Sequence, residues 1–164
     1  MRQVGKYKIS FLRPQCVDKV FRDLLNDDFI RKNVDEFFLY TANYYLLSRY
    51  IRQKKAIAYT LNEICSHKYL GVFLAFRKRN QLYVHSFFKK HRGANIVLTI
   101  SEMVERISRY YKRNGITVSK FITHIPENNK AAIWVTRKVG GKYSGSIHSS
   151  KNGKILEYIL NFPM

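Results

Sequence analysis

The apolar run at residues 69–76 constrains the fold of this chain more than any other segment. It reads YLGVFLAF and lacks the alternation of polar and apolar residues that marks a strand with one face in water. Such a run predicts a strand that is buried on both faces, in the middle of a sheet. Further β-type runs flank it at residues 56–61 and 81–88, beyond polar turns at 65–68 and 77–80. The three runs together predict an antiparallel meander.

Helical periodicity predicts the elements that pack against this sheet. The clearest stripe follows Gly93, where apolar residues recur at the spacing of one helix face and charged residues occupy the other. Its apolar members are Ile96, Ile100, Met103, Val104, Ile107 and Tyr111. Further helices are expected at residues 17–25, 34–51 and 129–139, and further strands at 6–12, 118–125, 142–147 and 154–160, the last two as a hairpin around Asn152-Gly153.

The order of these elements is β-α-α-β-β-β-α-β-α-β-β. It predicts an α/β (α+β) fold with a mixed, mostly antiparallel central sheet flanked by helices on both faces. No repeat, low-complexity tract or Pro/Gly/Ser-rich linker marks an internal boundary. We therefore expect a single domain over residues 1–164.

Composition narrows the class of protein. No segment approaches the roughly 20 uninterrupted apolar residues of a membrane-spanning helix, and the first residues lack the apolar region of a signal peptide. Cys16 and Cys65 have neither a CxxC spacing nor a nearby histidine pair, so we expect two reduced thiols and no metal site. These features predict a soluble cytoplasmic protein without membrane contact.

The net charge is the most unusual property of the composition. Thirty Lys and Arg residues against eleven Asp and Glu residues give a formal charge of +19. A charge of this size attracts polyanions over a distance, most strongly at low salt, which favours nucleic acid or an acidic protein as a partner. The alternative is that surface lysines serve solubility alone. The cations expected to contact a polyanion are Lys89, Lys90, Arg106, Arg109, Lys112 and Arg113.

Residues 125–140, IPENNKAAIWVTRKVG, carry the most specific local pattern. Asn129 suits a helix N-cap, because its short amide can accept a hydrogen bond from a free helix N–H, and Gly140 suits the end of the same helix. The segment resembles the Asn-x-x-Ala-Ile…Lys-Leu-Gly-Phe signature of the GNAT superfamily of acyl-CoA-dependent N-acetyltransferases. The order of elements is similar to that of this superfamily over essentially the whole chain.

Residues 89–97, KKHRGANIV, resemble the pyrophosphate loop of the same superfamily. Small residues there let backbone N–H groups at a helix N-terminus approach the diphosphate of the cofactor. In this chain Asn95 stands at a position where the family has glycine, and Val97 at a position where it has a small residue. The resemblance implies acetyl-CoA as the cofactor, bound by Val84, Phe87, Arg92, Gly93, Ala94, Asn95 and Asn129.

The resemblance also locates the catalytic groups. Transfer from a thioester to an amine needs a base for the amine and a proton for the leaving thiolate, and in the family a tyrosine often supplies that proton. The tyrosine position falls on Thr136, whose hydroxyl is a far weaker proton donor than a phenol. The best base candidates are His85, on the splayed fourth strand, and Glu63 or His67 near the neighbouring turn. A histidine in a strand can equally be a structural residue.

Three functions are consistent with these features. The first is an N-acetyltransferase that moves acetyl from acetyl-CoA to an amine on an acidic or nucleic-acid-associated acceptor. The second is a catalytically silent GNAT-fold protein that acts as a virion or host-interaction component, since basic chains of this style are also similar to small phage-encoded proteins, some carried inside virions. The third is a nucleic-acid-binding module, although no RNA-recognition or helix-turn-helix signature accompanies the charge.

Overall fold

The computed structural model describes residues 3–4, 7–33, 44–89, 95–149 and 153–161. The chain forms two compact units, one of residues 1–75 and 86–94 and the other of residues 76–85 and 95–164. The expectation of a single domain over residues 1–164 stays a prediction.

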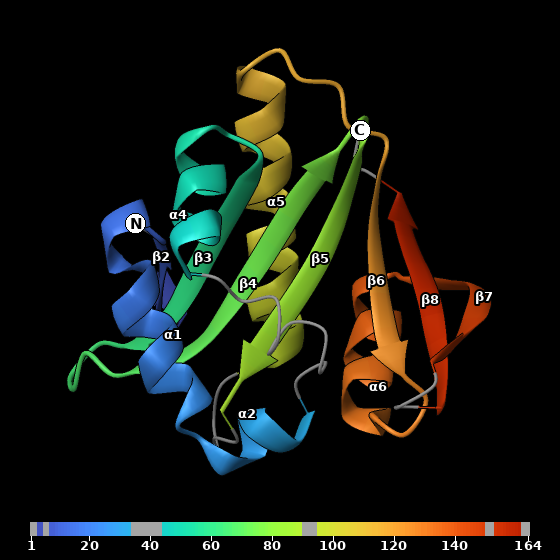
Figure 1. Ribbon diagram of the computed structural model, residues 1–164, viewed down its shortest axis with the longest axis horizontal. Coiled ribbons are helices and arrows are strands. Elements are labelled where there is room, and N and C mark those ends of the chain that lie inside the picture. The colour runs from blue at the N-terminus through green and yellow to red at the C-terminus, as the bar shows by residue number, and fades with distance from the viewer. Residues whose placement is uncertain (1–2, 5–6, 34–43, 90–94, 150–152, 162–164) are drawn as a thin grey trace. The chain divides into compact units, whose positions relative to one another are not determined.

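The first unit is built from the N-terminal strands and helices (Figure 1). Its elements are β1 (Gln3–Val4), β2 (Tyr7–Phe11), the 3-10 turn η1 (Pro14–Cys16), α1 (Val17–Leu25), α2 (Asp28–Asn33), α4 (Tyr44–Arg52), β3 (Ala56–Glu63), most of β4 (Tyr69–Lys78) and the end of β5 (Gln81–Phe88). Strand β2 pairs antiparallel with both β1 and β3. Helices α1 and α4 pack against each other and lie on the same side of β2 and β3 (Figure 1).

Burial along these elements follows the periodicities of the sequence. The α1 residues that the helical pattern selects are fully or almost fully buried, namely Val17, Val20, Phe21 and Leu24. In β4, the five consecutive residues Gly71–Ala75 are all buried, which confirms the prediction of a strand covered on both faces. Its neighbours in the strand order are β3 and β5, so β4 also lies inside the sheet.

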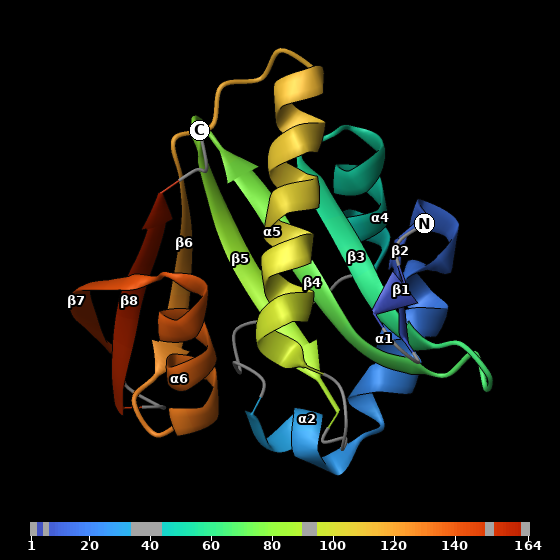
Figure 2. The same ribbon diagram turned by 180° about the vertical axis from the view of Figure 1, so that it is seen from behind.

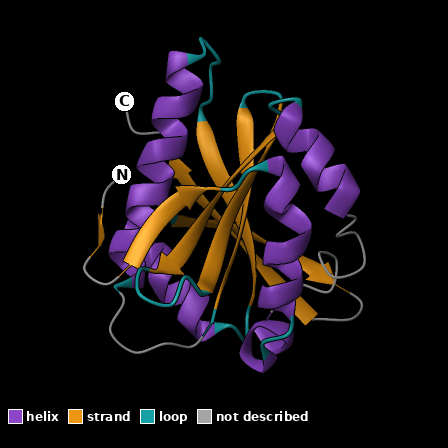
Figure 3. Ribbon diagram, turned by 90° about the vertical axis from the view of Figure 1, so that its left-hand side faces the viewer, coloured by secondary structure: helices purple, strands orange, loops and turns teal. Residues whose placement is uncertain are grey.

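The second unit contains the long helix and the C-terminal strands. Its further elements are α5 (Ile96–Arg113), β6 (Lys120–Pro126), α6 (Lys130–Val139), β7 (Lys142–Ser149) and β8 (Gly153–Asn161), which Figure 3 distinguishes by colour as helices and strands. Strand β6 pairs parallel with β5 and antiparallel with β8, and β8 pairs antiparallel with β7. Helices α5 and α6 contact each other and lie on the same side of β6 (Figure 2).

The strand order over the described residues is β1-β2-β3-β4-β5-β6-β8-β7. The sheet is therefore mixed and mostly antiparallel, with flanking helices, and the predicted α/β class is correct. The predicted elements at 6–12, 17–25, 56–61, 69–76, 81–88, 118–125 and 129–139 and the terminal hairpin are all present with small shifts of their ends. The long helix begins at Ile96, as its apolar stripe predicted.

Three details differ from the sequence-based expectation. Helix α2 was not predicted, and it begins where the Asp27 carboxylate accepts a hydrogen bond from the Ile30 amide at 3.0 Å. Of the helix expected at 34–51, the structure describes only α4 from Tyr44 onward, and residues 34–43 lie outside the described part. The turn expected at 77–80 shrinks to two residues, because Arg79 adopts a left-handed backbone conformation with φ 57°.

The close approach of β4 and β5 in the first unit provides a test of the packing. A Cβ atom on Gly71 would lie 2.6 Å from the Phe87 carbonyl oxygen and 2.1 Å from Cδ1 of Phe88. Because the Phe87 contact is with backbone, we expect Gly71→Ala to lower the free energy of unfolding by about 1–3 kcal/mol in urea titrations. Gly145→Ala is the control, since nothing lies within 4 Å of its Cβ position. Equal stability of the two variants would contradict the packing described here.

Candidate functional site

Strands β5 and β6 pair in parallel through their backbones for a short distance. A hydrogen bond from a side chain follows this backbone pairing. The backbone register of the two strands covers three pairs, from Gln81↔Lys120 to Tyr83↔Ile122. At the next position the Thr123 hydroxyl donates to the Val84 carbonyl at 3.3 Å, so a side chain serves a carbonyl that a continuing ladder would pair with an amide. The place where backbone pairing gives way thus lies at Val84 and Thr123.

One face of these strands carries the polar groups of the site. Ile125 and Tyr158 pack against Ile133 of α6, so they mark the face of β6 and β8 that is covered by that helix. Because side chains alternate along a strand, His124 and its cross-strand partner Glu157 point to the opposite face. On β5, alternation puts His85 on the same face as Tyr83, whose ring is the described aromatic neighbour of His124.

His124 and Glu157 form a hydrogen-bonded pair. Nε2 of His124 lies 2.9 Å from Oε2 of Glu157, and the Ser144 hydroxyl donates to Oε1 of Glu157 at 2.7 Å. These two hydrogen bonds, that from Ser144 first, lower the pKa of Glu157 below its usual value. An ionised carboxylate only accepts, so Nε2 of His124 carries the proton of this hydrogen bond.

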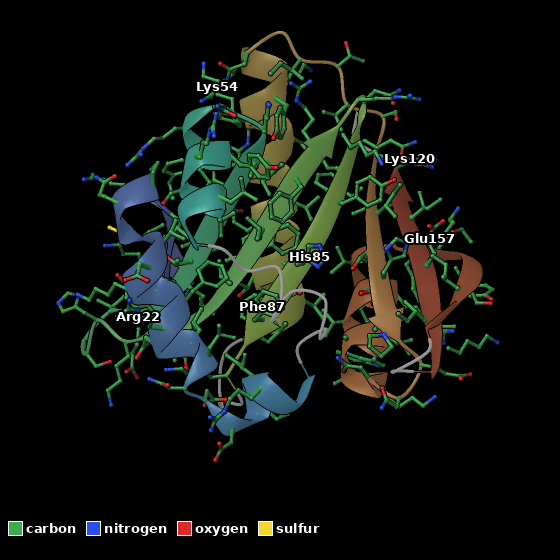
Figure 4. All side chains as sticks on the ribbon, viewed as in Figure 1. Arg22, Lys54, His85, Phe87, Lys120 and Glu157 are labelled. Atoms are coloured by element: carbon green, nitrogen blue, oxygen red, sulfur yellow. The ribbon has the colours of Figure 1, made fainter. Side chains whose placement is uncertain are left out.

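Tyr83 completes this face beside the imidazole. Its ring centroid lies 6.2 Å from that of His124, with the planes tilted by 43°. Its hydroxyl donates to Oε1 of Gln81 at 3.3 Å. We name this set, Tyr83, His85, His124 and Glu157, the histidine site; Figure 4 labels His85 on β5 and Glu157 on β8.

His85 is the predicted base, and the structure places it half-buried in β5. Its ring meets Phe76 edge-on, with centroids 6.0 Å apart and an interplanar angle of 73°. An aromatic contact of this kind restricts the orientation of an imidazole. His85 therefore remains a candidate base, on the same strand and face as Tyr83.

Glu63, the second predicted base, lies in the first compact unit, whereas the histidine site lies in the second. Its carboxylate accepts a hydrogen bond from Ser66, and its backbone carbonyl accepts the amide of His67 at 3.0 Å. His67 itself adopts φ 56°, in the left-handed region. The described contacts of Glu63 are with the turn between β3 and β4, and its role as a base stays a prediction.

Two of the predicted cofactor contacts are helix caps. The Asn129 side chain accepts from the Ala132 amide at 3.2 Å, and Gly140 ends α6 with φ 106°, so both predicted caps are confirmed. Asn95 caps α5 in the same way, accepting from the Leu98 amide at 3.1 Å. That amide is therefore engaged at the position where the sequence predicted a diphosphate.

The remaining predicted cofactor contacts are divided between the units and the undescribed segments. Val84 lies in the second unit and offers its carbonyl to Thr123, whereas Phe87 lies buried in the first. Residues 90–94, which include Lys90, Arg92, Gly93 and Ala94, lie outside the described residues.

Thr136 has a packing role that the sequence did not reveal. Its carbonyl accepts the Gly141 amide at 2.9 Å. A Cβ on Gly141 would lie 2.7 Å from Cγ2 of Thr136, so the threonine methyl packs closely on the turn after α6. The residue at the family's tyrosine position thus supports the turn into β7.

Several of the predicted polyanion contacts are already paired with acidic residues. Arg106 lies 3.0 Å from Glu102, and Arg109 lies 3.2 Å from Glu105. Lys89 lies 3.3 Å from Asp23 in the first unit. Lys112 and Arg113 are exposed in the last turn of α5, where cations complement the helix dipole.

Among the described residues, no group of three or more His, Cys, Asp or Glu side chains is placed to hold a metal ion. No helix in the described ranges is long and apolar enough to cross a membrane.

The chain matches known proteins in structure and not in sequence. No family model and no curated protein matches the sequence. Among solved structures, the ribosomal-protein-S5-alanine acetyltransferase from Vibrio fischeri superposes with a TM-score of 0.76 at 8% identity, over 98% of this chain and 96% of that one. This chain has the GNAT fold.

Two other structures of the GNAT fold are similar to the chain. Spermidine N-acetyltransferase from Vibrio cholerae, in complex with CoA and spermine, has a TM-score of 0.69 and 10% identity, and the match covers 96% of each chain. A probable acetyltransferase from Staphylococcus epidermidis has a TM-score of 0.73 and 12% identity, over 96% of this chain and 99% of that one. At these identities the likeness establishes the fold alone.

The sequence analysis missed His124, Glu157 and Ser144. His124 and Glu157 are 33 positions apart, and only the register of β6 on β8 brings them together. The available signal was the pair of strands predicted at 118–125 and 154–160, one of which carries His124 and the other Glu157. Without the register, that signal does not distinguish a contact from two separate surface residues.

The lowered pKa of Glu157 predicts a pH-dependent contribution to stability. A carboxyl whose pKa is lower in the folded state stabilises the fold above its unfolded value, near the ordinary 4.5, and loses that effect as the pH falls through the folded-state pKa. We expect Glu157→Gln to cost about 1 kcal/mol at neutral pH, shrinking towards zero in strong acid. Urea unfolding over a pH series measures this.

The control is Glu127→Gln, which removes the same charge from an exposed residue of the same unit. A difference between wild type and Glu157→Gln that stayed constant from neutral to strongly acidic pH would show that the carboxylate contributes no charged hydrogen bond.

Proposed function

We propose that this protein transfers an acetyl group from acetyl-CoA to an amine. The observation that carries the proposal is the histidine site at the point where β5 and β6 stop pairing through their backbones. The GNAT fold supports it, and one structural neighbour, the spermidine N-acetyltransferase, contains CoA. In the superfamily that the sequence resembles, the splayed strand is where the thioester binds.

The reaction defines what the site must provide. The neutral amine nitrogen attacks the thioester carbonyl and forms a C–N bond, and the C–S bond then breaks to release the CoA thiolate. The nitrogen loses one proton to a base, and the thiolate gains one. A base with a lone pair near neutral pH and a proton donor on the same face meet both needs.

The histidine site offers groups for both roles. His85 and His124 supply one imidazole each, and Glu157 accepts from Nε2 of His124, which leaves Nδ1 as the atom of that ring that can act as a base. Tyr83 carries a phenol on the same face, a better donor to a thiolate than the alcohol of Thr136. In this proposal the imidazole pair accepts the amine proton and Tyr83 returns one to the thiolate.

Charge selects the class of acceptor. The spermidine N-acetyltransferase acts on a polyamine by its name. A chain of charge +19 repels such a cation and attracts an acidic molecule. We therefore propose an amine on an acidic protein or on a nucleic-acid-associated molecule as the acceptor.

A GNAT-fold protein without catalysis is the second candidate. The Asn95 side chain already accepts the hydrogen bond of the Leu98 amide at the start of α5. Thr136, at the position where the family has a tyrosine, packs on the turn after α6. Both features fit a chain that has lost cofactor chemistry and acts as a virion or host-interaction component.

Calorimetric titration with acetyl-CoA tests the proposal at the level of binding. We expect one molecule bound per chain. Steady-state thiol release with acidic-protein and amine acceptors then tests turnover. Binding without release on any acceptor would favour the non-catalytic candidate, and the absence of both would contradict the acetyltransferase proposal.

Variants of the imidazole pair test the assignment of the base. His85→Ala or His124→Ala should lower turnover by about 10²-fold in whichever variant removes the base, with little change in acetyl-CoA affinity. Thr136→Val, which keeps the packed methyl, is the matched control and should stay within a few-fold of wild type. If both histidine variants retained full turnover, the base would lie elsewhere.

A further inference from the structure

The surface formed by α6 and β7 combines exposed aromatic rings with cations. We define the α6–β7 surface as Trp134, Arg137, Lys138, Lys142 and Tyr143. Trp134 is 57% exposed and Tyr143 is 53% exposed, which is unusual for rings of this size. The three cations are exposed as well. This surface lies wholly in the second compact unit.

Described contacts join four of these side chains into two groups, which lie on neighbouring turns of α6 and on the start of β7. The Lys138 ammonium lies 5.6 Å from the centroid of the Trp134 ring, one helical turn away. The Arg137 guanidinium lies 5.8 Å from the centroid of the Tyr158 ring, and Tyr143 meets the same ring edge-on at 5.9 Å. Tyr158 itself is buried, so it is a fixed support for both neighbours.

The sequence segment that carries the α6–β7 surface has no acidic residues. Residues 128–156 contain no Asp or Glu, whereas Arg106 and Arg109 of α5 are paired with Glu102 and Glu105. The next acidic residue along the chain, Glu157, is bonded to His124 and Ser144. The same segment carries six cations, Lys130, Arg137, Lys138, Lys142, Lys151 and Lys154.

We infer that the α6–β7 surface binds single-stranded nucleic acid. Unpaired bases stack on exposed aromatic rings, and the phosphates between them bind lysine and arginine. An acidic protein would satisfy the cations but would leave the indole of Trp134 without a specific partner. A duplex would also satisfy the cations, but its bases are stacked on each other and cannot reach the rings.

This inference is separate from the proposed acetyl transfer. Trp134 and Lys138 lie on one face of α6, while Thr136 is two residues from each, turned away by the helical period. The binding measurement below contains no acetyl-CoA, so its failure would leave the proposed acetyltransferase untouched, and the reverse holds as well.

Trp134 is the single tryptophan of the chain and reports directly on its own contacts. An unlabelled oligo-dT about 16 nucleotides long should quench its fluorescence as bases stack on the ring. A polyglutamate of equal charge and a duplex of equal length are the comparison ligands. We expect strong quenching with oligo-dT only, and an affinity that falls steeply between about 50 and 200 mM salt.

Variants separate stacking from charge, with affinity read from the anisotropy of a labelled oligo-dT. Trp134→Ala should weaken binding about tenfold, and Trp134→Phe, which keeps a ring, should stay within a few-fold of wild type. Arg137→Gln and Lys138→Gln should weaken binding and reduce its salt dependence. Lys19→Gln, an exposed lysine of α1, is the control for charge and should have little effect.

Three results would overturn the inference. They are unchanged affinity in Trp134→Ala with an intact circular dichroism spectrum, equal affinity for duplex or polyglutamate, and no binding of oligo-dT at low salt. Equal affinity for polyglutamate would assign the surface to acidic proteins instead.

Discussion

The need to satisfy backbone hydrogen-bonding groups governs the candidate site. A strand inside a sheet pairs its amides and carbonyls with its neighbours, and unpaired groups in a buried position are costly. Parallel pairing of β5 with β6 covers three residue pairs, and the Thr123 hydroxyl then serves the Val84 carbonyl. His85 and His124 are the residues that follow this change directly. The end of the backbone pairing therefore also determines where the site lies.

In the second unit, the pairing of β6 with β8 supports the histidine site. The β6–β8 register runs over seven residue pairs, from Lys120↔Asn161 to Pro126↔Ile155. His124 and Glu157 are one of those pairs, so their hydrogen bond rests on a continuous antiparallel ladder. Ile125 and Tyr158, on the other face of the same two strands, are anchored in the core with Ile133. The imidazole of His124 is thereby supported by a continuous ladder on one side, beside the end of the β5–β6 pairing.

Local chemistry predicted most of the fold from the sequence. Periodicity identified α1 and α5, and the unbroken apolar run identified β4. Capping residues identified both ends of α6, at Asn129 and Gly140. These signals depend on residues within about one turn or one strand of each other. The same reasoning missed α2, because its Asp27 cap starts a helix too short to show a periodic stripe.

Prediction of the site was less complete because its contacts are not local. Glu63 was chosen for its closeness in the sequence to a predicted turn, and it serves that turn. The partnership of His124 with Glu157 required the register of two strands, which a one-residue slip would abolish. His85 was found because the family resemblance singled out its strand, and the contact of its ring with Phe76 adds an orientation that no pattern predicted.

The net charge predicted the class of partner but not the surface that would bind it. The predicted contacts Arg106 and Arg109 lie on the helix that also carries Glu102 and Glu105, at the spacing that forms ion pairs within a helix. A cation in such a pair attracts a phosphate less, because the acid already neutralises it. The acid-free segment 128–156 has no such competition, and the exposed rings of Trp134 and Tyr143 lie within it. The distribution of acids, more than that of bases, thus determines where a basic protein attracts a polyanion.

The Asn95 cap bears on whether acetyl-CoA can bind at the start of α5. A side-chain cap stabilises a helix by about 1 kcal/mol, and Asn95 gives this to α5 through the Leu98 amide. A diphosphate oxygen that accepted from the same amide would have to displace the cap, but a charged acceptor forms a hydrogen bond of about 1.5–3 kcal/mol. The exchange is therefore favourable on balance, although less so than at a glycine, where no cap must be displaced. Asparagine at this position weakens a diphosphate site without abolishing it, and the affinity for acetyl-CoA then depends more on the other contacts of the cofactor.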